Sequence, residues 1–594
     1  MFRQKIRHQL KGKSEAVRQA QRRNAEESFE RLLQQEAENQ KKWTKQMEDI
    51  VEEQKRIIAA KDKIIQEREM RIRELEVQPE KTRTLQNIDG WRRRKCFLDH
   101  GSDPLNSHDS GNGGLRKNAE SDQMIQWVVC ESDTIIVTVT NHLRNGEGTS
   151  IHWHGFHARN EQYMDGVSML TQCPIPVAGN SFTYKINASP PGTHWWHAHT
   201  GMQRSDGIYG ALTVRQSRTV EYNNDTYDYD LPEHKMLLSD WLDRPVLDKF
   251  IAHHHSNGNN KPEAFLINGK GKRQGFLDPV SNKTIYTERE VFTVENGSRY
   301  RFRLVSNAIT NCPLKISIDS HNMTVIASDG SPFEPFETEI LVIYGGERFD
   351  IVLNANQNVE NYWIRAKGLA DCIKVHEMAI LRYKGAPNEQ PDEEETWDRQ
   401  GLTMNPWNEE MSELNIPYFF MNSTEPNDVT LERADYTYYF GMDFNKVNNS
   451  HFYDPMYYPL SVVPRSHHLY SPQLNGVSFS LPSVPPLSQY DDVVASGTDL
   501  CTPEDVEKLN CSQKHCECTH VIHVEIGKVM EFVIIDEGVI FDASHPMHLH
   551  GHSFRVVDQR KLGKMTSVKE VQEMDLAGTT VLKASLATAM YIRQ

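Results

Sequence analysis

The sequence contains no apolar run that approaches the length of a membrane-spanning helix, which is about 18 or more residues. It also contains no nucleophile elbow, no phosphate-binding loop and no dinucleotide-binding fingerprint. The first residues, MFRQKIRHQLKGKSEAVRQAQ, have no apolar h-region, so no signal peptide is visible. A helical membrane span is therefore excluded, and the usual signatures of serine hydrolases, P-loop NTPases and dinucleotide-dependent dehydrogenases are unmatched.

Regular CxxC spacing is absent as well. The sequence has nine cysteines, and the cluster Cys501, Cys511, Cys516 and Cys518 is too irregular for a CxxC zinc site. Disulfides are the favoured interpretation. Eight N-x-S/T sequons, which begin at Asn187, Asn224, Asn282, Asn296, Asn322, Asn422, Asn448 and Asn510, also favour a secreted glycoprotein. An extracellular location is expected from these features, although the N-terminus does not match it.

Residues 14–77 lack both proline and glycine, and Ala, Glu, Gln, Lys and Arg dominate them. This composition predicts one long helix, with a turn-rich linker at 102–114. A heptad seam runs from Phe29 to Leu75, but six of its fourteen positions are polar. Two interpretations stay open: a coiled coil that mediates self-association, and a solvated single helix.

The charge is unevenly distributed along the chain. Residues 1–80 hold 19 Lys and Arg against 16 Asp and Glu, whereas the whole chain has a net charge of −16. The remainder is therefore strongly acidic, which argues against nucleic acid as its partner.

After the linker, short β-branched or alternating runs alternate with Gly, Asn and Pro turns. These runs predict strands at 134–139, 181–186, 211–214, 291–294, 299–305, 316–327, 340–344 and 349–353. The fold class is therefore all-β, with sandwiches in series. We expect a helix and linker over 1–95 and three sandwiches at 96–217, 230–385 and 430–594.

Three histidine clusters stand out: IHWHG (151–155), WHAHT (196–200) and HPMHLHGH (545–552). In a strand, residues i and i+2 point to the same face, about 6.5–7 Å apart, so each His-x-His offers two parallel imidazoles. One such pair is more often a solvated pair on an edge strand. Three of them, beside aromatic residues or glycines, indicate a metal site, and imidazoles without carboxylates favour copper.

These clusters and their surroundings resemble the multicopper oxidases, in particular the laccase-like enzymes of arthropods. The matching stretches lie at 151–175, 192–216, 264–271, 302–330, 475–489, 516–527 and 544–557. The resemblance implies three cupredoxin Greek-key domains. It also implies that a type 1 copper takes electrons singly from a diphenol or related aromatic donor, and that a trinuclear copper cluster reduces dioxygen to water. Ferrous iron or ascorbate as donor stays open.

The resemblance also implies roles for individual residues. His152 and His548 match type 2 copper ligands, His154, His197, His199 and His550 match type 3 ligands, and His545 matches a type 1 ligand. Asp165 matches the acid that supplies protons near the cluster, although a turn residue that bonds its own backbone would look the same. Cys173 and Cys312 match a disulfide between the first two domains. His157, His194 and His552 match no ligand position.

The match is incomplete after His550. The remaining 44 residues contain no cysteine, whereas a blue copper site needs a thiolate with two histidines. Seven of the family's ten histidine ligands are present. We therefore expect the chain to be a truncated, alternatively spliced or mis-assembled product, with an incomplete third sandwich. The second hypothesis is therefore a catalytically incomplete copper-binding or coiled-coil interaction protein.

Overall fold

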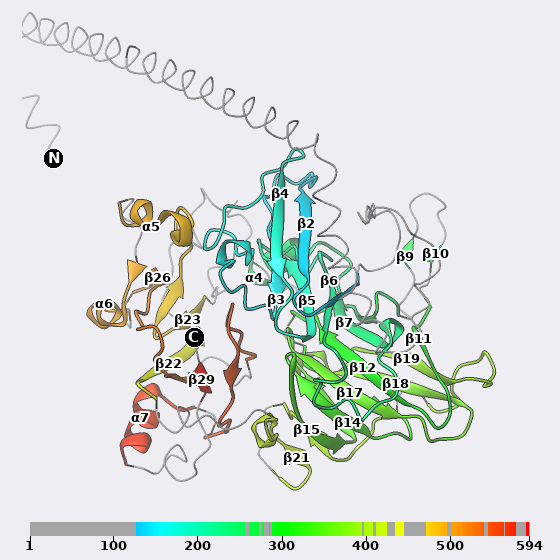
Figure 1. Ribbon diagram of the computed structural model, residues 1–594. Coiled ribbons are helices and arrows are strands. Elements are labelled where there is room, and N and C mark those ends of the chain that lie inside the picture. Colours follow the sequence, from blue (N-terminus) through cyan, green and yellow to red (C-terminus); the bar gives the residue numbers. More distant parts are fainter. Residues whose placement is uncertain are drawn as a thin grey trace, which may run out of the picture. The chain divides into compact units, whose positions relative to one another are not determined.

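The computed structural model describes Lys45 and residues 126–592, with gaps at 256–260, 272–275, 278–283, 286–287, 311, 395–396, 408–411, 425–433, 445–470, 496–499, 512–513, 540–544, 564 and 578–589. Apart from Lys45, which is helical, the helix predicted over 14–77 and its coiled-coil seam lie outside the described residues. None of the described helices is long and apolar enough to cross a membrane. The described residues are mostly β-sheet, as the sequence predicts (Figure 1).

The first group of strands holds two of the three histidine clusters. A four-stranded sheet has the order β1-β6-β5-β3, and β2 pairs with β4 in a separate antiparallel ladder. The bounds are β1 Trp127–Cys130, β2 Thr134–Thr140, β3 Ile151–His154, β4 Ser181–Asn187, β5 Gly192–Ala198 and β6 Tyr209–Arg215. A buried cluster that includes Trp153, Tyr184 and Ile186 fills the space between the two sheets. The predicted strands 134–139, 181–186 and 211–214 are confirmed.

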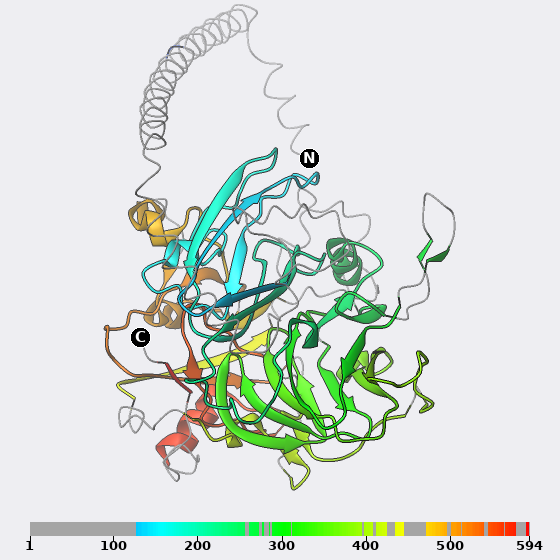
Figure 2. The ribbon, with the colours of Figure 1, turned by 45° about the vertical axis from the view of Figure 1, so that its right-hand side comes forward.

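The second group is a pair of larger sheets, drawn in green in Figures 1 and 2. A six-stranded sheet has the order β15-β14-β17-β12-β7-β8, and a seven-stranded sheet has the order β11-β19-β18-β13-β16-β20-β21. Their strands are β7 Lys235–Trp241, β8 Ala264–Ile267, β11 Val291–Val294, β12 Arg299–Ser306, β13 Leu314–Ile318, β14 Met323–Ser328, β15 Ser331–Thr338, β16 Ile340–Ile343, β17 Arg348–Asn354, β18 Asn361–Gly368, β19 His376–Tyr383, β20 Thr403–Met404 and β21 Asn415–Ile416. A short hairpin of β9 Phe276–Leu277 and β10 Thr284–Ile285 stands beside them.

The largest core lies between these two sheets. Phe302 of β12 and Ile351 of β17 meet Ile316 of β13 and Ile364 of β18, all fully buried. Burial of each such side chain stabilises the fold by roughly 1.5–3 kcal/mol. The alternation of RYRFRLV explains the arrangement: Tyr300, Phe302 and Leu304 enter this core, and the arginines between them point to the opposite face.

The third group is one eight-stranded sheet with the order β25-β26-β24-β23-β22-β27-β29-β28. Its strands are β22 Tyr436–Phe444, β23 Pro472–Leu474, β24 Val477–Phe479, β25 Leu500–Cys501, β26 Glu517–His520, β27 Met530–Asp536, β28 Phe554–Arg555 and β29 Met590–Ile592. Four helices lie along the described chain: α4 Val246–His255, α5 Pro486–Ala495, α6 Pro503–Lys508 and α7 Val568–Leu576. Short 3-10 turns are η2 Gln162–Met164, η3 Pro232–His234, η4 Ala370–Cys372 and η5 Tyr418–Phe420.

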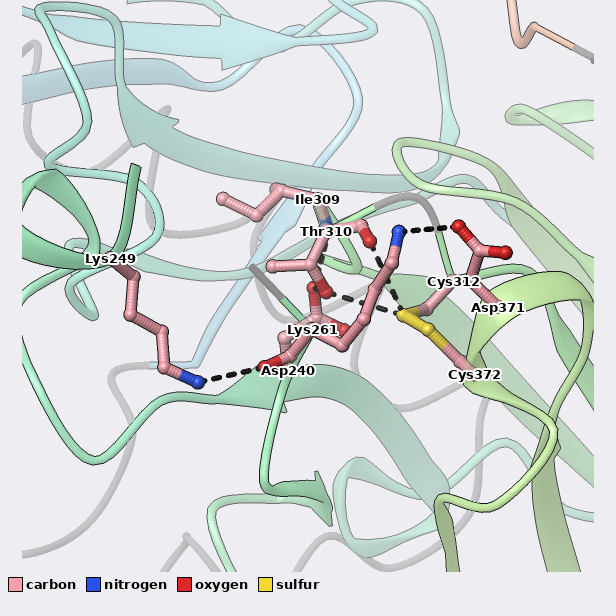
Figure 3. The surroundings of a disulfide bond; sticks show 8 residues. All are labelled: Asp240, Lys249, Lys261, Ile309, Thr310, Cys312, Asp371 and Cys372. Carbon is pink, nitrogen blue, oxygen red and sulfur yellow. Dashed lines mark hydrogen bonds and ion pairs between the residues drawn. A yellow bond between two sulfur atoms is a disulfide. The ribbon is translucent and has the colours of Figure 1, made fainter. Parts of the chain in front are cut away.

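The prediction of a disulfide between Cys173 and Cys312 is wrong. Cys312 is bonded to Cys372 with 5.5 Å between the Cα atoms, and Cys173 is a free, exposed cysteine. Strand pairing explains the partner, because Leu314 of β13 stands opposite Gly368 of β18. Cys312 precedes β13 and Cys372 follows β18, so both reach the same end of this ladder (Figure 3). The disulfides predicted for the late cluster are confirmed as Cys501–Cys518 and Cys511–Cys516.

Candidate metal centre

Strand pairing brings the first two histidine clusters together. β3 runs antiparallel to β5, and His152 stands directly opposite His197. Their ring centroids are 5.3 Å apart, and that of His154 is 5.5 Å from His152. His199, just beyond β5, lies 5.5 Å from His152. Because i and i+2 share a face in a strand, both His-x-His pairs present their rings on one side of this ladder.

The segment 545–552 supplies two further rings to the same place. His548 stacks on His154, with centroids 3.8 Å apart and planes 16° from parallel. His550 lies 4.0 Å from His152 and 5.1 Å from His199. Six imidazoles from the two ends of the described chain therefore form one cluster, which we call the histidine cluster: His152, His154, His197, His199, His548 and His550.

The spacing of the ring nitrogens suits metal binding. One group of three, His152, His548 and His550, has its ligand atoms within 4.8 Å of one another, and so has His152 with His154 and His197. The Nε2 atoms of His548 and His152 are 3.4 Å apart. Two nitrogens that share a tetrahedral ion at about 2.0–2.1 Å lie about 3.4 Å apart, so the donor set fits a metal ion.

Burial keeps five of these rings, those of His152, His154, His197, His199 and His548, in the neutral form, which is the form that binds metal. Desolvation, reinforced by the neighbouring histidines, lowers the pKa of His152, and it lowers the pKa of His154 and His197 well below the ordinary value. The same causes lower the pKa of His199 to about 3 and that of His548 below its ordinary value. Neutral imidazole offers a lone pair, whereas imidazolium does not.

Asp165 contacts the cluster from the turn that follows η2. Its backbone carbonyl lies 2.8 Å from His152 Nδ1, and its carboxylate oxygens lie 3.2 Å from that atom and 2.9 Å from His550 Nδ1. Burial alone would raise the pKa of Asp165, but the hydrogen bonds from His152 and His550 outweigh it and hold the pKa well below its usual range. With Nδ1 donating to Asp165, the Nε2 atom of His152 keeps its lone pair.

Residues that the sequence did not single out hold β5 in place. Arg348 Nε donates to the carbonyl of Thr193 at 3.2 Å, and the Thr193 hydroxyl donates to Asp350 at 2.5 Å. Arg303, which stands opposite Asp350 in the β12–β17 ladder, donates to the Thr193 hydroxyl at 2.7 Å. Thr193, which these buried side chains contact, lies four residues before His197 on β5. The available signal was the two buried arginines of the strand RYRFRLV, Arg301 and Arg303, because buried charges need partners.

The turn after His154 has a further support. Gly155 has φ +97°, and a Cβ built on it would lie 2.2 Å from His194 Nδ1. His194 is completely buried, and its Nε2 donates to the carbonyl of Pro190 at 2.9 Å. The glycine of HWHG is therefore required by the close approach of His194, which supports the turn without joining the cluster.

His545 stands apart from the histidine cluster. Its Nδ1 lies 3.2 Å from the carboxylate of Asp536, and Phe444 is 6.4 Å away by ring centroids. In the described part of the chain after residue 500, all four cysteines are paired in disulfides. The donors around His545 in that part therefore do not fit a copper site of the thiolate type.

Comparisons with known proteins agree with this geometry. Three family models described as multicopper oxidase match residues 125–219, 233–386 and 481–584. Laccase-5 of Trametes villosa is 32% identical over 448 residues, which cover 73% of this chain and 72% of that protein. The laccase of Trametes maxima is 30% identical over 435 residues, covering 71% and 72%.

Solved structures share the fold. Fet3p, a multicopper oxidase that functions in iron import, superposes with a TM-score of 0.55 at 19% identity, covering 74% of this chain and 72% of Fet3p. The laccase of Botrytis aclada gives a TM-score of 0.54 at 23% identity, covering 78% and 76%. The family matches, the identity to laccases and the histidine cluster lead to one conclusion: this chain belongs to the multicopper oxidases, which are copper-dependent oxidoreductases.

Proposed function

We propose that this protein is a laccase-type oxidase of the arthropod kind, which oxidises diphenols or related aromatic donors and passes the electrons to dioxygen, forming water. The observation that carries the proposal is the convergence of six imidazoles from β3, β5 and the segment 545–552. The proposal includes three cupredoxin domains, at 96–217, 230–385 and 430–594. The proposal also includes a secreted location. Ferrous iron or ascorbate is the alternative electron donor.

In this proposal a type 2 copper would be bound by His152 and His548. A pair of type 3 copper ions would be bound by four further histidines: His154, His197, His199 and His550. Bound copper supplies one-electron exchange between the donor and dioxygen. The protein keeps His154 and His197 neutral by burial, so their rings offer lone pairs near pH 7. Asp165 accepts hydrogen bonds from His152 and His550, which fixes the direction of their Nε2 atoms.

Asp165 also serves, in this proposal, as the acid that supplies protons beside the cluster. Its carboxylate reaches two rings from opposite ends of the described chain, and it is 6% exposed. The direction of its pKa, well below the usual range, means that the carboxylate is ionised at neutral pH in the metal-free protein. It would accept a proton there before it passes one on.

A second candidate function has a specific observation behind it. His545, the expected type 1 ligand, contacts the Asp536 carboxylate, and the sequence has no cysteine between Cys518 and Gln594. A chain of these residues alone would bind copper at the histidine cluster without a port for single electrons from a phenol. This candidate is a copper-binding protein, or an interaction protein that acts through residues 14–77.

One experiment separates the two candidates. The purified 594-residue chain is loaded with copper, and bound copper, the blue thiolate band and dioxygen uptake with a diphenol are measured. For these residues alone we expect bound copper, no blue band, and no uptake above the free-copper background. Appending the family's His-Cys-His strands should produce the blue band and the diphenol-dependent uptake of dioxygen.

Two results would contradict these assignments. Failure to bind copper would refute the role of the histidine cluster. A blue and active 594-residue chain would show that a thiolate of Cys511, Cys516 or Cys518 reaches His545.

A further inference from the structure

A second group of side chains that could bind a metal ion lies at the edge of the eight-stranded sheet, on β25 and β26. β25 pairs in parallel with β26, and Cys501 stands opposite His520 in this register. Cys518 and His520 are two residues apart on β26, so their side chains share one face of the strand. Two sulfurs and one imidazole therefore converge on one side of a two-strand ladder.

The ligand atoms are already close together. One atom from each of Cys501, Cys518 and His520 lies within 4.8 Å of the other two. The Nε2 atom of His520 is buried, and it has no hydrogen-bond partner among the residues that the structure describes. A buried ring nitrogen without a partner requires an explanation, and a ligand position for an ion is one.

The backbone that carries these side chains does not depend on the disulfide alone. Val521 N donates to the carbonyl of Cys501 at 2.9 Å, and Ser480 N donates to that of Cys518 at 3.0 Å. The hydroxyl of Thr519 donates to the Ser480 carbonyl at 2.5 Å. Opening the sulfur–sulfur bond therefore leaves both strands paired, and the three side chains stay on the same face.

We propose that reduction of the Cys501–Cys518 disulfide opens a three-ligand site for a thiophilic d¹⁰ cation, Zn²⁺ or Cu⁺, with His520 as the third ligand. The reductant is a dithiol. It gives two electrons and two protons to the disulfide, which becomes two thiols, and it leaves as its own cyclic disulfide. Binding of the cation then releases the two thiol protons to solvent.

The donor set decides the class of cation. Two thiolates with one imidazole suit soft or borderline ions, whereas Mg²⁺ and Ca²⁺ require oxygen ligands. The site shares no residue with the histidine cluster, and it goes beyond the oxidase function proposed above. Spacing within the sequence did not indicate it, because Cys501 comes from a neighbouring strand 17 residues before Cys518.

The burial of both sulfurs sets the conditions of reduction. Cys501 is 5% exposed and Cys518 is 1% exposed, so a dithiol reaches them only when the chain opens locally. β25 is a two-residue strand at the end of its sheet, where such opening costs least. The site would therefore form slowly and under sustained reduction.

The test compares the oxidised and reduced full-length chain. The protein is incubated with dithiothreitol, which is then removed by anaerobic gel filtration. The reduced chain is titrated with Zn²⁺ in competition with a chromophoric chelator. In a second titration, Cd²⁺ reports thiolate ligation by its ultraviolet charge-transfer band. We expect one additional bound ion per reduced chain. His520→Gln should weaken that binding by about tenfold or more, because loss of a residue that only hydrogen-bonds to a metal ligand already costs about 10–100-fold.

Matched variants identify the site. His523→Gln changes an exposed histidine three residues away, and a Cys511→Ser/Cys516→Ser double variant removes the neighbouring disulfide. Both should keep the additional ion, and a Cys501→Ser/Cys518→Ser double variant should lose it. Reduction without an additional ion, retention of that ion in His520→Gln, or loss of the β-sheet circular dichroism on reduction would each overturn the proposal.

Discussion

The carboxylate of Asp165 and the imidazole of His550 are joined by a 2.9 Å hydrogen bond although they are 385 residues apart in the sequence. The same carboxyl group lies 3.2 Å from His152 Nδ1. One residue therefore orients one ring from each end of the described chain. Such outer partners determine the tautomer and direction of a metal-binding ring.

Asp165→Asn should lower the copper affinity of the chain by about 10–100-fold, since an outer partner of metal-binding histidines is weakened. The amide has one acceptor oxygen where the carboxylate offers two, so it cannot accept from both rings in the same way. The measurement is copper competition against a chelator of known affinity. Asp228→Asn, which alters an exposed ion pair with Arg299, is the control and should leave the affinity unchanged. Equal affinities of the two variants would contradict the positioning role.

His548→Ala should abolish the stabilisation of the fold by copper. His548 stacks on His154 and faces His152, so it links the segment 545–552 to β3. A ligand at about 100 times its dissociation constant stabilises a folded protein by about 2.7 kcal/mol, which raises the melting temperature. Calorimetry with and without copper measures this. The exposed His142 gives the control variant, His142→Ala, and a copper-dependent rise that survives in His548→Ala would contradict the prediction.

Much of the site could be predicted from the sequence because the required patterns are local. His-x-His within a strand has a fixed period of two residues, so the faces of His152 and His154, and of His197 and His199, follow directly. The apolar alternation of RYRFRLV likewise predicted β12 and its core face.

What could not be predicted depends on register between distant strands. Cys372 reaches Cys312 only because β13 and β18 pair, and the hold of Arg303 and Asp350 on Thr193 depends on contacts between sheets. β20 and β21 also pair onto the seven-stranded sheet, although they come from a stretch that was expected to lie between domains. A sequence lists the polar partners, but it does not show which strand brings them together.

Cys312→Ser should lower the free energy of unfolding by about 2–4 kcal/mol, because the Cys312–Cys372 disulfide closes a long loop. Cys173→Ser should change it by no more than about 0.5 kcal/mol, since Cys173 is free and exposed. Chemical denaturation measures both variants. Figure 3 shows a second link beside the disulfide, an ion pair at 2.9 Å between Lys261 and Asp371, which both variants keep. Non-reducing peptide mapping that recovered Cys173 joined to Cys312 would contradict this assignment.

The metal-free protein should lose stability as the pH falls below about 6.5, and His194 should account for a measurable part of this loss. Burial, with the nearby charge of Arg348, lowers the pKa of His194 to about 3. In the unfolded chain the same ring has its ordinary pKa of about 6.5, so between these values the unfolded state binds one more proton than the folded state. Stability is therefore fully present above about pH 6.5 and declines as the pH falls towards 3.

From pH 7 to pH 5 this one residue should cost the folded state about 2 kcal/mol, at about 1.36 kcal/mol for each pH unit below 6.5. Urea denaturation at several pH values gives the slope. His194→Gln removes the titrating group and should flatten the slope by that amount, even though it lowers stability at pH 7 by disturbing the turn at Gly155. His142→Gln, at an exposed position, should leave the slope of the parent chain intact. If the slopes of the parent and His194→Gln coincide, the buried ring of His194 is not the group that titrates on unfolding.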